Sequence, residues 1–388
     1  MPAMNGLSNI AANAAAGALR FDRVAITCVF GDPRDVRSWS GAPANLATAL
    51  EKLGVVVEAI RPQMSRLAKL GVAACDMIAG LGRPLSSEQI LRSSRSRRKL
   101  GEQVAEAADR LGARHVIHTG TFDLPAPDRS GSVRHYLYCD HSWALARIHH
   151  IHAHRFGGKA MEAFERAERE ALGGLAHVFT FGGYVRDNLI RHYGLSPDRV
   201  TAVGSGMGSI EPYDGPKSYA EPRLLFVAKH LFQAKGGFLL LEAFDRARRR
   251  RPDLKLTIVG DERSRRFVDE RPGITFHAFL PWPALQQLYR DASLLVQPML
   301  NDPWGQVYLE AMASRTPVMG LNRHGLPEIV DGGRHGFLVD RAEPSALAEA
   351  IVCAVSDPQR LERMATAAQR HVLENYSWRQ VAERIAYS

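Results

Sequence analysis

The segment from Asp302 to Ala313 combines two carboxylates with a glycine at the predicted start of a helix. Asp302 precedes a proline, a pattern typical of a helix N-cap, and the run from Gly305 to Ala313 predicts the helix itself. The lack of side-chain bulk at Gly305 leaves backbone N–H groups available to an anion. Glu310, further along the same helix, is a fixed carboxylate that could accept hydrogen bonds from two neighbouring hydroxyls. The segment therefore offers a phosphate site and a diol acceptor, as a nucleotide diphosphate requires.

The composition indicates a soluble globular protein of two domains. The chain has 388 residues, of which 45% are hydrophobic and 23% charged. No apolar run is long enough to span a membrane, and the alanine-rich N-terminus is a poor signal peptide. The net charge of +9 favours anionic partners such as phosphate-bearing substrates or an anionic membrane. Nucleic acid is not expected, because no motif for it is visible.

The cysteines and histidines do not predict a metal site. Cysteines occur at Cys28, Cys75, Cys139 and Cys353, without metal or redox spacing, so reduced core thiols in a cytoplasmic protein are expected. The histidines that crowd between residues 135 and 154 are too closely spaced to supply four zinc ligands.

The first part of the chain predicts a parallel sheet. Strand, loop, helix and strand follow one another from residue 21 to residue 60, and Ser40-Gly41 ends the loop. Another strand, 135–139, ends at Asp140-His141. In open α/β sheets ligands bind beyond the carboxyl ends of strands, so Asp140 and His141 are candidates for chemistry. A capping or loop role for this pair, and a plain turn at Ser40-Gly41, remain open.

The segment that begins at Asp302 resembles the signature of the retaining GT-B glycosyltransferases of the family 4 type, the glycosyl transferases group 1. The shared elements are an acidic residue, Pro, an aromatic residue and Gly, then Leu-Glu-Ala-Met-Ala, followed by Thr-Pro-Val at 316–318 and Gly-x-Pro-Glu at 325–328. The first acid is usually Glu in that family and is Asp302 here. The resemblance is strong over residues 223–388 and weaker over 21–206.

The resemblance implies an α/β fold of the GT-B type, with two Rossmann-like domains facing a central cleft. The implied parts are a mobile tail (1–20), an acceptor-binding domain (21–210), a linker (211–222), a nucleotide-sugar-binding domain (223–374) and a C-terminal helix crossing back to the first domain (375–388). The linker is rich in Pro, Gly and Tyr, which agrees with this division.

The resemblance also implies the roles of individual residues. Lys229 and Lys235 would face the donor phosphates, since positive charge there can neutralise a departing diphosphate. The other implied ligands of the substrates are Asp302 for the donor sugar, Gly305 and Gln306 for the diphosphate, Glu310 for the ribose, Ser40 and Gly41 in the first Gly-rich loop, and Asp140 and His141 near the transferred sugar. No metal is expected if the lysines and the helix dipole supply the positive charge, and no cofactor is expected, since the nucleotide-sugar is a co-substrate.

The implied function is a retaining hexosyltransferase that moves a sugar from a nucleotide-sugar to an acceptor hydroxyl. The acceptor would be a glycan, a lipid-linked sugar or a small molecule, in cell-surface polysaccharide or glycolipid biosynthesis in the cytoplasm. Two alternatives stay open. One is a sugar-nucleotide epimerase of the same architecture, and the other is a non-catalytic sugar-nucleotide-binding protein.

A basic run in the first domain predicts one further contact. It comprises Arg92, Arg95, Arg97, Arg98 and Lys99. Serines between these residues indicate a hydrophilic loop, which could attach the protein peripherally to an anionic membrane by charge. The alternative is an ordinary solvated loop.

Overall fold

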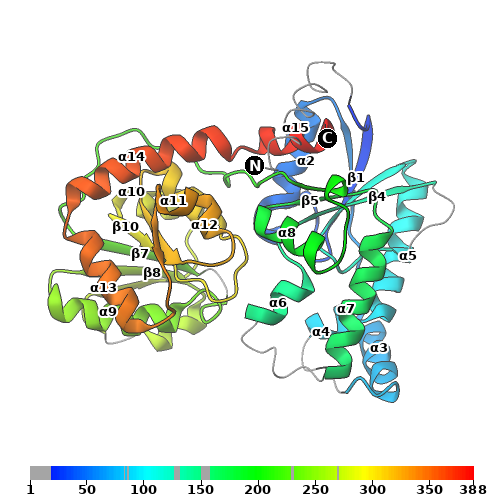
Figure 1. Cartoon of the computed structure of the whole chain (residues 1–388), viewed down its shortest axis with the longest axis horizontal. Coiled ribbons are helices and arrows are strands. Elements are labelled where there is room, and N and C mark those ends of the chain that lie inside the picture. The colour runs from blue at the N-terminus through cyan, green and yellow to red at the C-terminus, as the bar shows by residue number, and fades with distance from the viewer. Residues whose placement is uncertain are drawn as a thin grey trace. The chain divides into compact units, whose positions relative to one another are not determined.

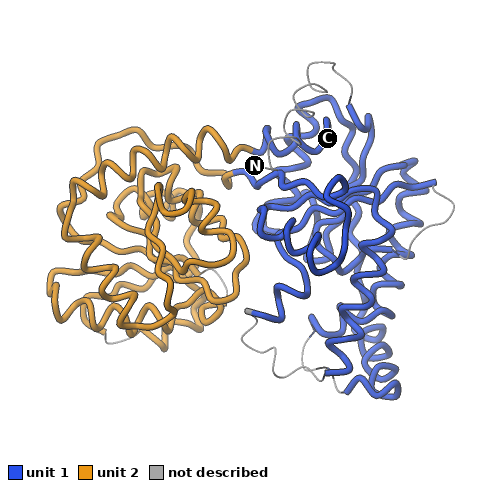
Figure 2. The backbone as a smooth tube through the Cα atoms, in the orientation of Figure 1, with its two compact units in different colours: residues 1–206, 378–388 blue, residues 207–377 orange. Residues whose placement is uncertain are grey.

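The computed structural model describes residues 19–82, 84, 87–125, 132–149, 158–228, 231–268 and 271–388. The chain divides into unit 1, residues 1–206 with 378–388, and unit 2, residues 207–377 (Figure 2). Most of the predicted tail lies outside the described residues. In the described ranges, no helix has the length and apolarity needed to cross a membrane.

Unit 1 contains a six-stranded parallel sheet with the order β2-β1-β3-β4-β5-β6 (Figure 1). Its strands are β1 (Arg23–Thr27), β2 (Val56–Ile60), β3 (His115–Thr119), β4 (Arg134–Cys139), β5 (His177–Thr180) and β6 (Val200–Ala202). Residues Val24 to Thr27 are all fully buried, because β1 is an inner strand covered on both faces. The strand order reverses between β1 and β3, which makes their loops the topological switch point of unit 1.

Helices cover the sheet of unit 1. They are α2 (Ala42–Lys52), α3 (Arg66–Ile78), α4 (Ser87–Arg92), α5 (Ser94–Arg110), α6 (Trp143–His149), α7 (Gly158–Gly173), α8 (Gly183–Arg191) and α15 (Trp378–Ala386). The C-terminal α15 packs on α2, and the Arg20 backbone N–H donates to the Ala386 carbonyl at 2.7 Å. A Cβ at Gly206 would lie 2.4 Å from the Trp378 ring, so this glycine permits the close approach of α15.

The basic run predicted as a loop is helical, and two of its five charges are paired. Arg92 ends α4 and pairs with Glu88 at 2.7 Å, while Arg95 in α5 pairs with Asp76 at 2.5 Å. Arg97 is only 7% exposed. The hydrophilic-loop prediction is wrong because Ser93 caps a helix, accepting from the Arg95 backbone N–H at 3.3 Å. Of the five basic residues, Arg98 and Lys99 are the exposed pair.

Unit 2 contains a second six-stranded parallel sheet with the order β12-β11-β10-β7-β8-β9. Its strands are β7 (Arg223–Ala228), β8 (Lys255–Gly260), β9 (Ile274–His277), β10 (Leu294–Val296), β11 (Val318–Leu321) and β12 (Phe337–Val339). The order reverses between β7 and β10, so the loops that follow these two strands form the switch point of unit 2.

The helices of unit 2 are α9 (Gly237–Arg250), α10 (Trp282–Asp291), α11 (Gln306–Ala313), α12 (Leu326–Ile329), α13 (Pro344–Val355) and α14 (Pro358–Asn375). The apolar faces of α9, α13 and α14 share one core with the strands, which includes Phe226, Phe244 and Ile351. The segment 211–222, predicted as a linker, lies within unit 2 and packs onto it. Tyr219 is buried in the same core, and the Lys217 ammonium donates to the Tyr289 carbonyl at 3.0 Å.

Candidate functional site

The switch point of unit 2 brings two of the predicted residues together. The loop after β10 is bound to the loop after β7, because the backbone N–H groups of Leu300 and Asn301 both donate to the Ala234 carbonyl, at 2.8 and 2.9 Å. The neighbouring side chains then meet, with Lys235 Nζ 2.6 Å from Asp302 Oδ2. Ligands in open parallel sheets bind at this type of position, so the pair lies where a substrate is expected.

The Lys235–Asp302 pair is charged and partly accessible. The two side chains are 16% and 25% exposed. Burial acts to raise the pKa of Asp302, but the Lys235 ammonium and, further away, the His324 ring outweigh it and hold that pKa below its ordinary value. The prediction of Asp302 as a helix N-cap is wrong. The helix begins later, with Gly305 as its N-cap, and the Asp302 carboxylate instead holds Lys235.

Two helix N-termini that no side chain caps adjoin this pair. Gly236 precedes α9 with φ +84°, and Gly305 precedes α11 with φ +79°. A Cβ at Gly236 would lie 2.0 Å from the Pro298 carbonyl oxygen, and one at Gly305 would lie 2.6 Å from Met299 Cε. Glycine is therefore required at both positions. The first turn of α11, which begins at Gln306, presents backbone N–H groups suited to an anion.

Glu310, predicted as a fixed carboxylate, is largely buried and already holds one hydrogen-bond partner. It is 8% exposed on α11, and its Oε2 accepts from the Tyr289 hydroxyl at 2.7 Å. Burial, together with the Glu310 carboxylate, raises the pKa of Tyr289 well above its ordinary value. The other oxygen, Oε1, lies 2.7 Å from where a Cβ on Gly208 would be, so glycine there keeps that edge of the carboxylate uncovered by a side chain.

The segment from Gly325 to Glu328 holds the loop that precedes α11. The Gly325 N–H donates to the Pro303 carbonyl at 3.0 Å, and a Cβ at Gly325 would lie 2.5 Å from the Trp304 ring. His324 precedes this turn at φ +57°, and its Nε2 lies 3.3 Å from the Leu300 carbonyl. The sequence reasoning missed His324, although its place beside a motif glycine was a usable signal.

In unit 1, Ser40 and Gly41 lie at the switch point after β1. Trp39, Ser40 and Gly41 occupy the left-handed region in succession, with φ of +40°, +56° and +80°. This region favours glycine, so the first two residues carry backbone strain. Ser40 is exposed, and α2 begins directly after Gly41 without a side-chain cap.

Asp140 and His141 follow the last residue of β4, at the carboxyl edge of the sheet. The Tyr184 hydroxyl donates to the Asp140 backbone carbonyl at 2.7 Å. Ser142 then caps α6, accepting from the Leu145 N–H at 3.2 Å. Strand β4 is one strand away from the switch point, so these residues lie on the same edge of unit 1 as the β1 and β3 loops.

The sequence reasoning missed a buried histidine–carboxylate group at the same edge. His118 Nδ1 lies 3.3 Å from Asp123 Oδ2, and His118 Nε2 lies 3.0 Å from His135 Nδ1. Asp123 is 1% exposed, and neither carboxylate oxygen has a hydrogen bond from the described residues. An aspartate shortly after the strand 115–119 was a signal that could have identified it.

Arg97 extends this group with further unused hydrogen-bonding capacity. Its Nε and Nη1, and Oε1 of the buried Glu168, have no hydrogen-bond partner in the described part of the chain. Burial lowers the pKa of Arg97, while the carboxylates of Glu168 and Asp123 act in the opposite sense. Donors and acceptors together in one buried place suit water or the hydroxyls of a polyol.

Several of the predicted residues lie outside the part of the chain that the structure describes. Lys229 and its neighbour His230 lie outside the described residues, as do the histidines at 150, 152 and 154. Among the residues that are described, no group of three or more His, Cys, Asp or Glu side chains is arranged to hold a metal ion.

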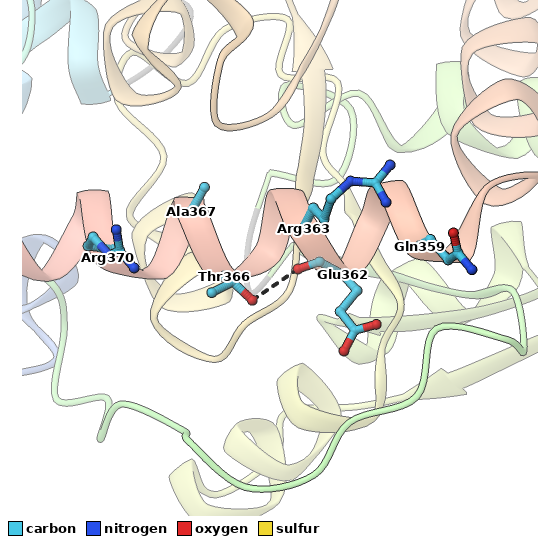
Figure 3. A pocket seen from close by; sticks show the side chains of 6 residues that line it. All are labelled: Gln359, Glu362, Arg363, Thr366, Ala367 and Arg370. Carbon is cyan, nitrogen blue, oxygen red and sulfur yellow. Dashed lines mark hydrogen bonds between the residues drawn. The ribbon is translucent and has the colours of Figure 1, made fainter.

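A hollow of about 540 Å³ on α14 involves none of the predicted residues. It is lined by Gln359, Glu362, Arg363, Thr366, Ala367 and Arg370 (Figure 3). All six come from one helix, and Thr366 uses its hydroxyl within that helix, donating to the Glu362 carbonyl at 3.1 Å. We therefore assign the chemistry to the switch-point residues and none to this hollow.

Comparison with known proteins identifies a family and a fold that this chain resembles. The family described as "Glycosyl transferases group 1" matches residues 214–371. The D-inositol 3-phosphate glycosyltransferase of Paenarthrobacter aurescens is 27% identical over 372 residues, which cover 87% of this chain and 88% of that protein.

Two solved structures share the fold. Sucrose-phosphate synthase from Thermosynechococcus elongatus superimposes with a TM-score of 0.72 at 18% identity, over 93% of this chain and 96% of that one. HepE of Anabaena, solved in complex with UDP-glucose, superimposes with a TM-score of 0.63 at 14% identity, over 94% and 98%.

Proposed function

Because the chain belongs to the group 1 glycosyltransferases and has the GT-B fold, we propose that it transfers a sugar from a nucleotide-sugar to an acceptor hydroxyl with retention of configuration. The observation that carries the proposal is the Lys235–Asp302 pair between two glycine-preceded helix N-termini at the switch point of unit 2. This arrangement supplies positive charge for a diphosphate and a carboxylate for a sugar hydroxyl in one place.

Unit 2 would bind the donor. In the transfer, the bond between the anomeric carbon and the diphosphate oxygen breaks, and its electron pair goes to the diphosphate. Lys235 and the first N–H groups of α11 would stabilise that growing charge, which is the main electrostatic requirement of such a step. Asp302 would fix Lys235 and accept from a hydroxyl of the donor sugar. The binding of UDP-glucose by HepE supports a nucleotide-sugar of this class as donor.

Glu310 would hold the ribose of the donor nucleotide. Its Oε2 is fixed by the Tyr289 hydroxyl, and its Oε1 faces the side of the chain that Gly208 leaves without a side chain. A carboxylate fixed in this way needs little reorganisation to accept from a ribose hydroxyl. No metal ion is needed for this donor site if Lys235 and α11 supply the positive charge.

Unit 1 would bind the acceptor, whose oxygen forms the new bond to the anomeric carbon and whose proton is released. Asp140, His141 and the Ser40–Gly41 turn lie at one edge of its sheet, as do the buried Asp123 and its neighbours. The name of the Paenarthrobacter relative contains D-inositol 3-phosphate, a phosphorylated polyol, which supports a polyol or glycan acceptor. We infer a role in polysaccharide or glycolipid biosynthesis in the cytoplasm.

The test is donor turnover in the presence and absence of acceptors. The protein is incubated with UDP-hexoses and a panel of polyol, polyol-phosphate and glycan acceptors, and product configuration is read by NMR. Transfer with retained configuration supports the proposal. Conversion of the donor to an epimer without acceptor would identify an epimerase instead. Nucleotide binding with neither transfer nor slow donor hydrolysis would identify a non-catalytic binder.

Lys235→Ala tests the residue at the centre of the proposal. Loss of a charge-assisted hydrogen bond is worth about 1.5–3 kcal/mol, so turnover should fall roughly ten- to a hundredfold. The matched control is Lys255→Ala, because Lys255 is an exposed lysine at the opposite, amino end of the neighbouring strand β8. Wild-type turnover in Lys235→Ala, or an equal loss in Lys255→Ala, would contradict the assignment.

A further inference from the structure

The loop that follows β11 also reaches the switch point of unit 2. Strands β10 and β11 pair in parallel, so the loops after them share the carboxyl edge of the sheet. His324 Nε2 lies 3.3 Å from the Leu300 carbonyl oxygen. The Gly325 N–H donates to the Pro303 carbonyl at 3.0 Å. These two contacts flank Asp302 along the chain, so the β11 loop holds the segment that carries this carboxylate.

His324 occupies a backbone conformation that favours glycine. Its φ is +57°, and the residue is half-buried. The glycine of the same turn, Gly325, has an ordinary φ of −79°, so the left-handed position falls on the histidine instead. A residue with a side chain pays conformational free energy there, and such residues cluster at functional sites. This placement points to a function for the imidazole.

The Leu300 backbone connects His324 to the Lys235–Asp302 pair. The Leu300 carbonyl lies beside the His324 ring, and its N–H donates to the Ala234 carbonyl at 2.8 Å. Lys235 directly follows Ala234, and its Nζ lies 2.6 Å from Asp302 Oδ2. Burial raises the pKa of Asp302, while the Lys235 ammonium and then the His324 ring act to lower it below its ordinary value. The imidazole is therefore part of the electrostatic environment of this pair.

The positive charge of the donor site depends on the β11 loop. In the loops after β7, β10 and β11, the basic side chains that the structure describes are Lys235, Arg323 and His324. The Asp302 carboxylate offsets the charge of Lys235. A helix N-terminus is equivalent to only about half an elementary charge. Each phosphate of a nucleotide-sugar is anionic, so a diphosphate calls for further positive charge, and the β11 loop can supply it.

We propose that His324 binds the diphosphate of the donor through its imidazolium ring, beside Lys235 and the start of α11. Its Nε2–H would donate to the Leu300 carbonyl and fix the ring, and its Nδ1–H would donate to a phosphate oxygen. The inference deepens the proposed function and rests on it, because it requires that unit 2 binds a nucleotide diphosphate. It does not require that transfer has taken place.

Inorganic pyrophosphate is the probe, since it carries the diphosphate without any particular base or sugar. Its affinity for the full chain is measured by calorimetry at a slightly acidic pH, where histidine is protonated. His324→Asn keeps a residue type that tolerates the left-handed region and removes the charge, so affinity should fall about tenfold or more. His324→Gly, which has no left-handed cost, should show the same loss. UDP is titrated in parallel.

The matched control is Arg315→Asn. Arg315 is also a basic, left-handed residue of unit 2, with φ +54°, but it precedes the amino end of β11, whereas His324 follows the carboxyl end. The control loses the same charge and should bind pyrophosphate like wild type. Arg323→Gln tests the neighbouring basic residue of the loop. Circular dichroism and thermal melts check that every variant folds.

A direct readout comes from the histidine ring signals in ¹H–¹⁵N NMR spectra. The signal that disappears in His324→Asn belongs to His324, and in the wild type it should move when pyrophosphate is added. A histidine that only holds the Leu300 carbonyl would keep its signal in place.

The outcomes separate this inference from the proposed transfer reaction, because none of them uses a transfer assay. Weaker pyrophosphate binding in both His324 variants, wild-type binding in Arg315→Asn and a shifted His324 signal support it. Wild-type affinity in His324→Asn, an equal loss in Arg315→Asn or an unmoved signal overturns it. A loss in Arg323→Gln alone would identify Arg323 as the ligand, which also overturns it. A wild-type protein that binds neither pyrophosphate nor UDP would remove the diphosphate site itself.

Discussion

In unit 2 the residues that directly precede α9 and α11 at the switch point are left-handed glycines, whereas in unit 1 the turn before α2 also places Trp39 and Ser40 in that region. Gly236 is required by its positive φ and by the Pro298 backbone that a Cβ would meet, whereas Gly305 is required mainly by its positive φ, because the nearest atoms belong to the flexible end of Met299. The unit 1 turn adopts left-handed φ values at two non-glycine residues and one glycine. The starts of the donor-site helices thus rest on closely packed glycines, with Leu231 (φ +62°) the strained residue of the loop after β7, while the proposed acceptor turn has two strained residues in succession and is partly exposed.

The two switch points also differ in how far their polar side chains are already hydrogen-bonded. Unit 2 pairs its charges, since Lys235 holds Asp302 at 2.6 Å and Tyr289 holds Glu310 at 2.7 Å. Unit 1 leaves the oxygens of the buried Asp123 without hydrogen bonds among the described residues. A diphosphate is a constant part of every nucleotide-sugar, so a preorganised site suits it. Acceptors differ between enzymes, and a buried set of unused donors and acceptors can be matched to one polyol.

The largest expected effect comes from glycine substitutions that compare the two turns. Gly236→Ala should destabilise unit 2 by about 3 kcal/mol, combining the left-handed backbone cost with a forced shift of the Pro298 carbonyl. Gly41→Ala should cost only about 1–2 kcal/mol, because its Cβ would meet atoms at 3.0 and 3.2 Å. Denaturant unfolding measures both.

The control for these glycine variants is Gly54→Ala. Gly54 has φ +88° with nothing within 4 Å of an added Cβ, so it reports the backbone cost alone. Gly236→Ala should exceed this reference clearly, and Gly41→Ala should lie near it. Equal losses at Gly236 and Gly54 would show that the packing of the unit 2 turn contributes nothing.

Next in size is the effect of the unit 1 residues on transfer. If Asp140 or His141 assists the acceptor, Asp140→Asn and His141→Ala should lower transfer on the order of a hundredfold, as general acid–base groups do. Nucleotide affinity and slow donor hydrolysis should stay near wild type, because those depend on unit 2. The Tyr184 bond to the Asp140 backbone carbonyl survives a side-chain change, so folding should be kept. Unchanged transfer in both variants would reduce the pair to loop structure.

Glu310 should report stability and donor affinity separately. Glu310→Ala leaves the fully buried Tyr289 hydroxyl without its acceptor, at a cost of about 1–3 kcal/mol. Glu310→Gln keeps an acceptor for Tyr289 and should therefore be nearly as stable as wild type, yet bind UDP more weakly. Unfolding curves and UDP titrations of both variants check this. If Glu310→Gln binds UDP normally, Glu310 is a structural partner of Tyr289 and not a ribose ligand.

The sequence predicted the donor half of the molecule better than the acceptor half, for a physical reason. In unit 2 the residues proposed for binding lie in short segments whose backbone conformation also restricts the residue types, such as Pro303-Trp304-Gly305. Such segments can be recognised in the sequence. The hydrogen bond from Tyr289 to Glu310 was not predicted, because Tyr289 is distant in sequence and the contact depends on tertiary packing.

In unit 1 the important contacts join residues that no local pattern links. His118 and His135, for example, meet only because β3 pairs with β4. The spacing of α3 would predict an amphipathic helix, but the period alone cannot tell whether the apolar side faces inward or outward. The serines around Arg95 indicated a loop, and the cap at Ser93 shows that they begin a helix instead.

The smallest expected effect tests the strain in the unit 1 turn directly. Ser40 is exposed at φ +56°, so Ser40→Gly removes a left-handed cost of about 1–2 kcal/mol and adds about 0.4–1 kcal/mol of unfolded-state entropy. The difference predicts stabilisation of about 0.5 kcal/mol, read as a higher midpoint in urea. If the strained turn positions the acceptor, transfer should fall in this more stable variant, while UDP affinity stays constant. A variant that is both more stable and fully active would mean that the strain serves no purpose in transfer, and the contrast between the two switch points would then be one of packing alone.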